Sequence, residues 1–300
     1  MPDSKERPVY GLSRKNKESG KEKLSTYDIV TEKISNRLEQ GDIPWKKPWK
    51  ARLPRNLITN KPYQGMNLLL LSDQDYSNPY WLTFTQAREK GGHVKRGEKG
   101  SLITFWKVTE KELEEKEGKE LRFLLRHYTV FNLEQCEGIE SPPVGEKIDP
   151  IKKCEDIISD YKTAPEVRTN NRNKAYYSPS GDYVSLPPKY SFNSSEGYYA
   201  SLFHEMTHST GHEKRLGRFN SKDYSRPFAG EEYSKEELIA ELGSAFLCAE
   251  AGIDNSELDN SAAYIQSWLK ALRNDKRLLI SASSQAAKAT RYILGQTDEG

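Results

Sequence analysis

Residues 202–212 read "LFHEMTHSTGH" and hold three of the five histidines of the chain. Within this stretch, His204, Glu205 and His208 form the pattern H-E-x-x-H. On an α-helix, four residues advance about 6 Å and return to nearly the same azimuth, so the two imidazoles point the same way. Two such imidazoles can share one divalent metal ion, with zinc expected and manganese or another ion as the alternative. Glu205 lies one position round the helix, where it can act as a general base without being a ligand. The competing interpretation is a polar helix face with two ordinary histidines.

A catalytic zinc site needs a third protein ligand, and His212 is poorly placed to supply it. It follows His204 by eight residues, which is about 12 Å along a continuous helix. The longer histidine motif would need a histidine where Lys214 stands, so that class of site is excluded. The third ligand must therefore come from another part of the chain.

The segment "SKEELIAELGSAFLCAE" (residues 234–250) offers that ligand. Glu237 and Glu241 are four residues apart and so share one face of a helix. The segment is similar to the E-x-x-x-D/E helix of glutamate-class zincins, which implies Glu237 as the ligand and Glu241 as the support of a ligand histidine. Ser234 and Glu237 also have the spacing of a capping box. If the helix began at Ser234, the backbone would occupy Glu237, and Glu241 would become the ligand.

The sequence "DYVSLP" (residues 182–187) predicts a strand just before the motif helix. In zincins, an edge strand at this place pairs with an extended peptide substrate. This similarity makes hydrolysis of a peptide bond the expected reaction, with Glu205 activating the water.

Charge is distributed unevenly along the chain. Residues 1–100 carry 20 Lys and Arg against 12 Asp and Glu, although the net charge of the whole chain is only +2. A basic N-terminal part is typical of proteins that bind a polyanion, but many soluble domains are mildly basic.

Aromatic and basic residues alternate in this basic part, beginning with "PWKKPWK" at residues 44–50. Single-stranded nucleic acid needs flat rings for unstacked bases and cations for phosphates. We expect the loop that carries Trp45 and Trp49 at the surface, whereas Trp81 and Trp106 also fit core positions because they lie in apolar runs. Binding through such residues would depend on salt and read little sequence. The candidate contacts are Trp45, Lys46, Lys47, Trp49, Lys50, Lys61, Tyr63, Trp81, Lys95, Arg96, Lys99 and Lys107.

Local patterns predict an α+β fold with two domains. We expect a disordered tail at 1–23, a first domain at 24–141, a proline-rich linker at 142–150 and a mostly helical second domain at 151–300. Capping boxes predict helices after Ser25 and Thr83, and the charged residues 109–120 predict a hairpin between two strands. Further helices are expected near 194–210, 234–251, 261–273 and 282–294.

Cysteine usage and hydropathy favour a cytoplasmic protein. The three cysteines are widely spaced, which is typical of a reducing compartment. The first residues lack the apolar core of a signal peptide, and no apolar run reaches the length of a membrane span.

Several long motifs in order resemble the ArdC-like antirestriction proteins of plasmids and other mobile elements. They include "IPWKKPW", "NKPYQGMNLLLL", "YWLTFTQAREKGGHVKRGEKG", "AYYSPSGDYVSLPP", "HEMTHSTGH" and "EELIAELGSAFLCAE". The resemblance implies an N-terminal domain that binds single-stranded DNA (ssDNA) non-specifically and a C-terminal zincin-like domain. It also implies protection of incoming DNA from host restriction.

Two hypotheses about function remain open at this point. In the first, the metallopeptidase domain cleaves a host protein. In the second, the chain only binds DNA, and the metal is structural or inactive. A primase or nuclease has little support, because the sequence has no triphosphate-binding loop and no acidic cluster for two metals.

Overall fold

The computed structural model describes residues 24–46, 53–72, 74, 76–112, 119–143, 149–171, 174–219, 231–256 and 262–296. The expected tail at 1–23 and most of the expected linker lie outside the described residues, as do Lys47, Trp49 and Lys50. In the described ranges, no helix is both long enough and apolar enough to cross a membrane.

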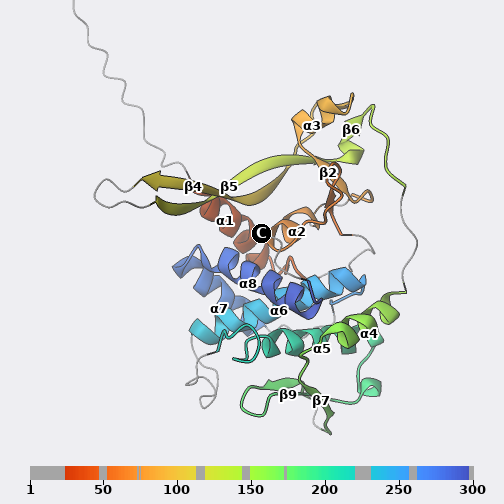
Figure 1. The fold of residues 1–300 in the computed structure, drawn as a ribbon, viewed down its shortest axis with the longest axis vertical. Coiled ribbons are helices and arrows are strands. Elements are labelled where there is room, and N and C mark those ends of the chain that lie inside the picture. The colour runs from red at the N-terminus through yellow and green to blue at the C-terminus, as the bar shows by residue number, and fades with distance from the viewer. Residues whose placement is uncertain are drawn as a thin grey trace, which may run out of the picture.

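The N-terminal half is an α+β unit around a four-stranded sheet with strand order β1-β2-β5-β4 (Figure 1). β2 runs parallel to β1 and antiparallel to β5, and β5 runs antiparallel to β4. A second, two-stranded sheet pairs β3 with β6. The elements are α1 (Thr26–Glu39), β1 (Arg55–Asn56), α2 (Met66–Ser72), β2 (Tyr80–Leu82), α3 (Phe84–Glu89), β3 (His93–Val94), β4 (Ser101–Glu112), β5 (Lys119–Asn132), η1 (Leu133–Gln135) and β6 (Cys136–Glu137).

Both helix starts expected in this half are confirmed. The Ser25 side chain accepts a hydrogen bond from the Asp28 backbone N–H, and Asp28 reaches back to the Ser25 backbone. Thr83 and Gln86 form the same reciprocal pair at the start of α3. Each pair satisfies two backbone donors that a helix leaves unpaired, which is why the local sequence alone fixes these boundaries.

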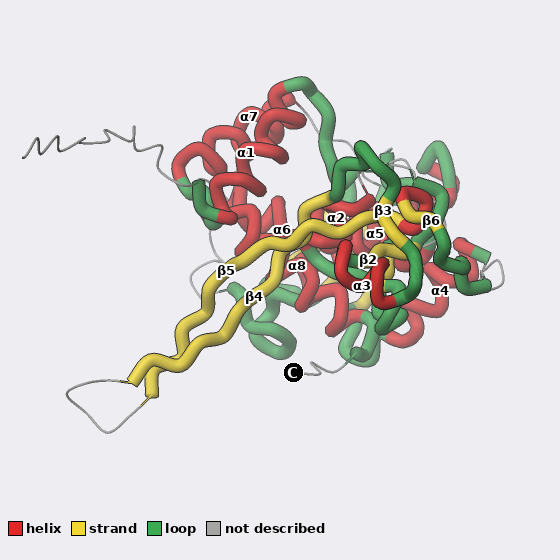
Figure 2. Tube along the Cα trace, turned by 90° about the horizontal axis from the view of Figure 1, so that it is seen from above, coloured by secondary structure: helices red, strands yellow, loops and turns green. Residues whose placement is uncertain are grey.

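The longest strands of the N-terminal half form the β4–β5 hairpin, which extends away from the helices (Figure 2). Its two strands pair without a break from Ser101 opposite Val130 to Glu112 opposite Lys119. The hairpin expected around residues 109–120 is therefore confirmed. At the base of the hairpin, the Asn67 side chain bonds both backbone groups of Thr104 and so occupies the open edge of β4.

The C-terminal half is mostly helical, with one small sheet of order β7-β9-β8. The α+β class with two units, expected from the sequence, is confirmed. The elements are α4 (Pro150–Asp160), β7 (Glu166–Thr169), β8 (Tyr176–Ser178), β9 (Tyr183–Leu186), η2 (Lys189–Ser191), α5 (Ser195–Ser209), α6 (Glu231–Ala251), α7 (Ala262–Asn274) and α8 (Leu278–Ile293).

The strand before the motif helix, β9, lies in the middle of its sheet. It pairs in parallel with β7 and antiparallel with β8. The expectation that this strand is an open edge for a substrate is therefore wrong, because its backbone groups are paired on both sides. Burial agrees with a central position, since Val184, Ser185 and Leu186 are all buried.

The two halves share one hydrophobic core, and Trp45 lies inside it. Side chains of α1, α2 and the Trp45 turn pack in the same buried cluster as α5, α6, α7 and α8. The Trp45 ring packs edge-on against Trp268 with centroids 5.5 Å apart, and Asn255 donates a hydrogen bond to the Trp45 carbonyl. Trp45 has no exposed surface. The expectation of a surface position for Trp45 is wrong, because burying the indole under α7 removes a large apolar area from water.

Candidate metal centre

Helix α5 places His204 and His208 on one side. The Ser194 side chain accepts a hydrogen bond from the Gly197 backbone N–H and fixes the start of the helix. The opposite side of α5 is held in the core by fully or nearly fully buried side chains, among them Tyr199, Leu202, Phe203 and Met206. The rotation of the helix is therefore set by its apolar side, which leaves the two histidines to face α6.

Helix α6 supplies the carboxylates, and it begins at Glu231, earlier than the sequence suggested. Ser234 lies within the helix and shares a hydrogen bond with Ser267 instead of capping it. The alternative in which Ser234 and Glu237 form a capping box is therefore excluded. The side chain of Glu237 is left available to face α5.

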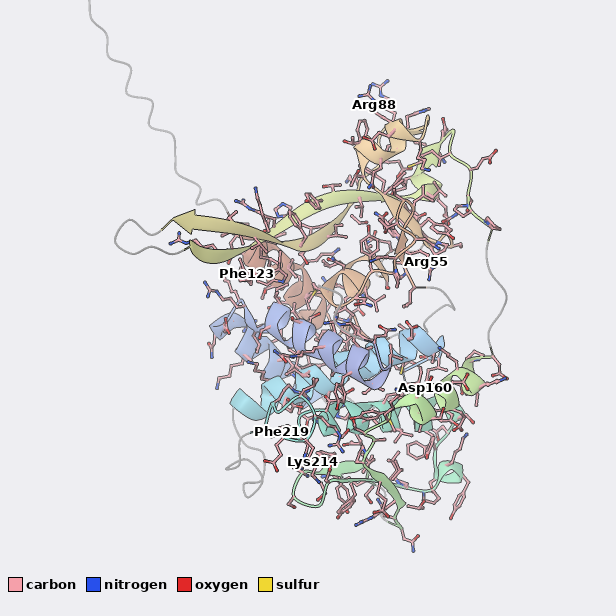
Figure 3. All side chains as sticks on the ribbon, in the orientation of Figure 1. Arg55, Arg88, Phe123, Asp160, Lys214 and Phe219 are labelled. Carbon is pink, nitrogen blue, oxygen red and sulfur yellow. The ribbon has the colours of Figure 1, made fainter. Side chains whose placement is uncertain are left out.

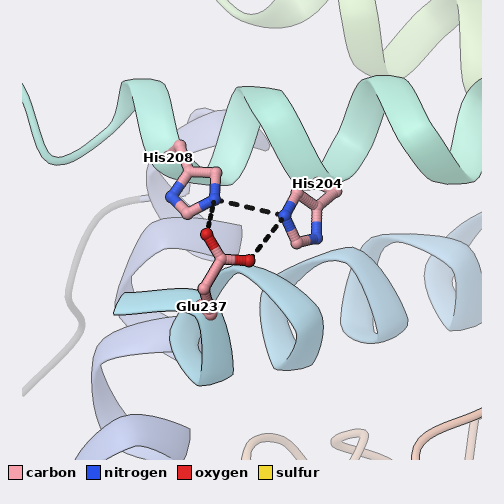
Figure 4. A group of neighbouring side chains, drawn as sticks. All are labelled: His204, His208 and Glu237. Carbon is pink, nitrogen blue, oxygen red and sulfur yellow. Dashed lines mark hydrogen bonds and ion pairs between the residues drawn. The ribbon is translucent and has the colours of Figure 1, made fainter. Parts of the chain in front are cut away.

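Glu237 reaches both histidines (Figure 4). Its two carboxylate oxygens lie 3.6 Å from His204 Nε2 and 3.5 Å from His208 Nε2. The two imidazole Nε2 atoms are 3.1 Å apart. One ligand atom from each residue can be chosen so that all three lie within 4.8 Å of one another. Two imidazole nitrogens and one carboxylate oxygen are the donor set of a His₂Glu metal site, so the residues fit a divalent ion.

Two further carboxylates hold the histidines from behind. Glu236 Oε1 lies 3.3 Å from His208 Nδ1, and Arg218 holds Glu236 through two contacts of 2.8 and 3.2 Å. Glu241 Oε1 lies 3.8 Å from His204 Nδ1, which is an ion-pair distance and too long for a hydrogen bond. Glu241 thus lies behind His204, where a supporting carboxylate was expected, and Glu236 makes a closer contact with His208. A carboxylate on Nδ1 directs the Nε2 lone pair of a histidine toward a metal.

The charges of the cluster favour a cation at its centre. Burial disfavours a charged imidazole, yet the Glu236 and Glu237 carboxylates raise the pKa of His208 well above its ordinary value. The pKa of His204 is also raised, because Glu237 and other nearby carboxylates outweigh its burial. Burial acts to raise the pKa of Glu237, but the two histidines hold it far below its usual range. Protons therefore occupy positions that a divalent ion would take, and metal binding should release them.

Glu205 follows His204 directly on α5. Its side chain is buried, with 8% of the residue surface exposed, and its negative charge raises the pKa values of both His204 and His208. Within the described ranges it makes no hydrogen bond. The carboxylate is therefore close enough to act electrostatically on both imidazoles.

His212 lies outside the cluster, as the helix geometry predicts. Helix α5 ends at Ser209, and the Nδ1 atom of His212 accepts a hydrogen bond from the Lys214 backbone N–H. Glu236 and Arg218 were not predicted from the sequence. The adjacent acids in "SKEELIAEL" are a signal for Glu236, whereas no local pattern indicates Arg218.

The residues proposed to contact nucleic acid fall into two groups. Trp45 and Trp81 are buried, at 0% and 2% exposure, and cannot stack on a base in this conformation. Trp106 is 47% exposed, so the interpretation of Trp106 as a core residue is wrong. Most of the basic candidates are at the surface. Lys61, Lys95, Arg96, Lys99 and Lys107 are exposed, and Lys46 and Tyr63 are partly buried.

Comparison with known proteins covers both halves of the chain. The sequence profile for the N-terminal domain of the anti-restriction factor ArdC matches residues 25–131, and that of a zincin-like metallopeptidase family matches residues 152–285. The metal-free crystal structure of the antirestriction protein ArdC from plasmid R388 is 37% identical to this chain. It superposes with a TM-score of 0.74, over 91% of this chain and 100% of that one. The chain belongs to the ArdC family.

Other relatives extend the comparison. The Mn(II)-bound structure of the R388 ArdC superposes with a TM-score of 0.73 at 38% identity, over 91% of this chain and 98% of that one. The uncharacterised protein y4eC of Sinorhizobium fredii is 32% identical over 91% of this chain and 92% of its own length. A DNA primase TraC of Escherichia coli is 35% identical over 89% of this chain. The chain spans only 27% of that primase and 21% of a second TraC.

Proposed function

We propose that this member of the ArdC family protects incoming mobile-element DNA from host restriction. In this proposal its N-terminal half binds ssDNA, and its C-terminal half is a metal-dependent peptidase acting on a host protein. The observation that carries the proposal is the convergence of His204, His208 and Glu237 beside Glu205, in a chain of this family.

The proposed reaction is hydrolysis of a peptide bond. A metal ion held by His204, His208 and Glu237 would supply Lewis acidity for the substrate carbonyl. Glu205 accepts the proton of the attacking water and returns it to the leaving amine. Glu236, held in turn by Arg218, keeps the His208 ring in the orientation that ligation needs.

Zinc is the metal that we propose. A tetrahedral site with two histidines, one glutamate and an open fourth position is typical of catalytic zinc. The R388 relative has been crystallised with Mn(II), and imidazole and carboxylate ligands also accept manganese. Elemental analysis of protein purified without chelator distinguishes the two ions. Less than one equivalent of any divalent metal would refute the site.

The decisive experiment is Glu205→Gln, measured for restriction protection in cells and for ssDNA binding in vitro. We expect protection to be lost and ssDNA binding to be unchanged, because the substitution removes only the base. Glu213→Gln is a matched control, since Glu213 is an exposed glutamate on the loop that follows α5.

The same experiment tests the competing proposal of a DNA-binding protein with a structural metal. If Glu205→Gln retains full protection while His204→Ala loses both metal and folding stability, the metal is structural and no peptidase step is needed. If ssDNA binding is absent in the unchanged protein, the DNA-binding half of the proposal is wrong.

A further inference from the structure

Two aromatic rings stack on the surface of the β4–β5 hairpin. The Phe105 and Tyr128 centroids are 3.9 Å apart, and their planes differ by 5°. In the strand register, Phe105 lies opposite Arg126 and Tyr128 lies opposite Ile103, so the two rings meet diagonally across the strands. Tyr128 is 49% exposed. Phe105 is partly buried, so Tyr128 is the more open ring of a stacked pair that the paired backbone holds in place.

Three cations lie on the same face of the hairpin as these rings. Figure 3 draws the side chains that project from the hairpin, with Phe123 of β5 labelled. Side chains alternate between the two faces of a strand, which places Lys107, Arg122 and Arg126 on the face of Phe105 and Tyr128. All three cationic side chains are exposed. Successive positions on one face are about 7 Å apart, so the cations are spread along the strands.

Among the hairpin residues whose side chains the structure describes, none is acidic. Residues 101–109 and 122–132, which are the described part of the hairpin with placed side chains, contain no Asp or Glu. Arg126 makes no hydrogen bond or ion pair within the described residues. The hairpin face therefore combines aromatic surface with positive charge. These are the two features that bind a ligand with flat rings and negative charge.

The other basic surface of this half is less suitable. Around β3, the Lys95 ammonium donates to the Glu134 carbonyl, and His93 lies 3.4 Å from Glu137. Glu98 adds a further negative charge beside Lys95. Charges of both signs alternate here, and the acidic groups weaken the attraction of this surface for a polyanion.

We propose that this hairpin face, formed by Phe105, Lys107, Arg122, Arg126 and Tyr128, binds single-stranded nucleic acid. An unpaired base stacks on the ring pair, and the three cations contact backbone phosphates. The proposal rests on the proposed ssDNA binding and states where that binding takes place. A duplex keeps its bases stacked inside, so it offers no free base to the rings. None of these side chains is placed to read a base edge, and the expected binding is independent of sequence.

The test measures affinity of the full chain for a labelled oligothymidylate by fluorescence anisotropy. Tyr128→Ala should weaken binding roughly 5- to 100-fold, the range expected for loss of stacking on one base. Tyr128→Phe keeps the ring and should bind like the unchanged protein. Tyr190→Ala is the matched control, because Tyr190 is 88% exposed on the C-terminal half and should have no effect.

A charge experiment tests the phosphate contacts separately. Lys107→Ala with Arg126→Ala should lower the slope of log affinity against log salt by about 1.4, the value for two lost contacts on a single strand. Lys270→Ala with Lys288→Ala removes the same charge from exposed positions on α7 and α8 and should leave the slope unchanged.

The outcomes separate the site from the function. No binding by the unchanged protein refutes the proposed ssDNA binding itself. Normal binding by that protein and by the Tyr128→Ala and Lys107→Ala/Arg126→Ala proteins refutes only the hairpin site. Equal affinity for a duplex of the same length refutes the single-strand class, and a parallel oligouridylate measurement distinguishes RNA from DNA. Unchanged thermal melting of Tyr128→Ala shows that a loss of affinity is not a loss of folding.

Discussion

Replacing Gly243 by alanine should disturb the metal site from within the helix pair that forms it. Gly243 lies in α6 where this helix touches Thr207 of α5, the residue before His208. A Cβ atom at Gly243 would stand 2.4 Å from Thr207 Cγ2, 2.7 Å from Oγ1 and 3.1 Å from Cβ. Rotation of Thr207 cannot clear the space, because all three atoms are close and Oγ1 is held by the Phe203 carbonyl at 2.8 Å.

The size of the effect follows from these distances. Carbon atoms pack at about 3.5–4.0 Å, so α5 and α6 must separate by about 1 Å at this point. Overpacking of this kind costs about 1–3 kcal/mol, of which alanine recovers about 1 kcal/mol through its better helix propensity. Metal–ligand distances tolerate only about 0.2 Å, so a shift of this size should lower metal affinity at least as much as loss of a supporting contact, roughly 10- to 100-fold.

The assay is a metal titration in competition with a chelator, together with thermal melting of the metal-free protein. Thr207→Ala should restore metal affinity in the double variant, because it removes the two atoms nearest to the new Cβ. Alone, Thr207→Ala should cost only about 1 kcal/mol for its lost hydrogen bond. If Gly243→Ala binds metal normally, or if Thr207→Ala fails to rescue it, close helix contact does not set the geometry of the site.

Three further predictions concern single side chains. In a chelator competition, Glu237→Gln should abolish tight metal binding, whereas Glu241→Gln should weaken it about 10- to 100-fold. A larger loss of metal affinity in Glu241→Gln than in Glu237→Gln would make Glu241 the ligand. Trp45→Ala should lower the free energy of unfolding by about 3–5 kcal/mol in urea titrations. The folded Trp45→Ala protein should bind ssDNA as tightly as the unchanged protein. A loss of ssDNA affinity without a loss of stability would show that Trp45 contacts DNA. Burial raises the pKa of the Glu250 carboxyl, and nearby Lys153 and Arg55 oppose this only in part. A carboxyl whose pKa is raised in the folded state destabilises the fold when it ionises, so Glu250→Gln should raise the melting temperature at pH 7. This gain in melting temperature should disappear below the pKa that the carboxyl has in the unfolded state. A lower melting temperature of Glu250→Gln at pH 7 would contradict the prediction.

Local rules predicted the parts of this protein that depend on near neighbours in sequence. The helix period places His204 and His208 together whatever the rest of the fold does, whereas His212 lies beyond the end of α5 at Ser209. The capping boxes at Ser25 and Thr83 satisfy backbone groups within one turn, so their helices start where the sequence indicates. The Glu237 assignment needed a further step, a similarity to other zincins, because its partners lie about thirty residues away.

The burial of the tryptophans could not be predicted from neighbouring residues in the sequence. Trp45 follows a proline among lysines, as a surface residue would, yet its partners Asn255 and Trp268 both lie more than two hundred residues later. Trp106 lies in an apolar run and is half exposed, although its ring packs edge-on against Tyr27 of α1.

By itself, then, the sequence determined the helix that carries His204 and His208 and the class of the fold, because these depend on periodicity and capping. Only the tertiary structure decided that Glu236 and Arg218 support His208, that β9 lies inside its sheet, and that Phe105 and Tyr128 stack on each other across the hairpin. The physical reason is that a side chain's exposure and partners are set by whichever distant segment packs against it, and packing is a property of the whole chain.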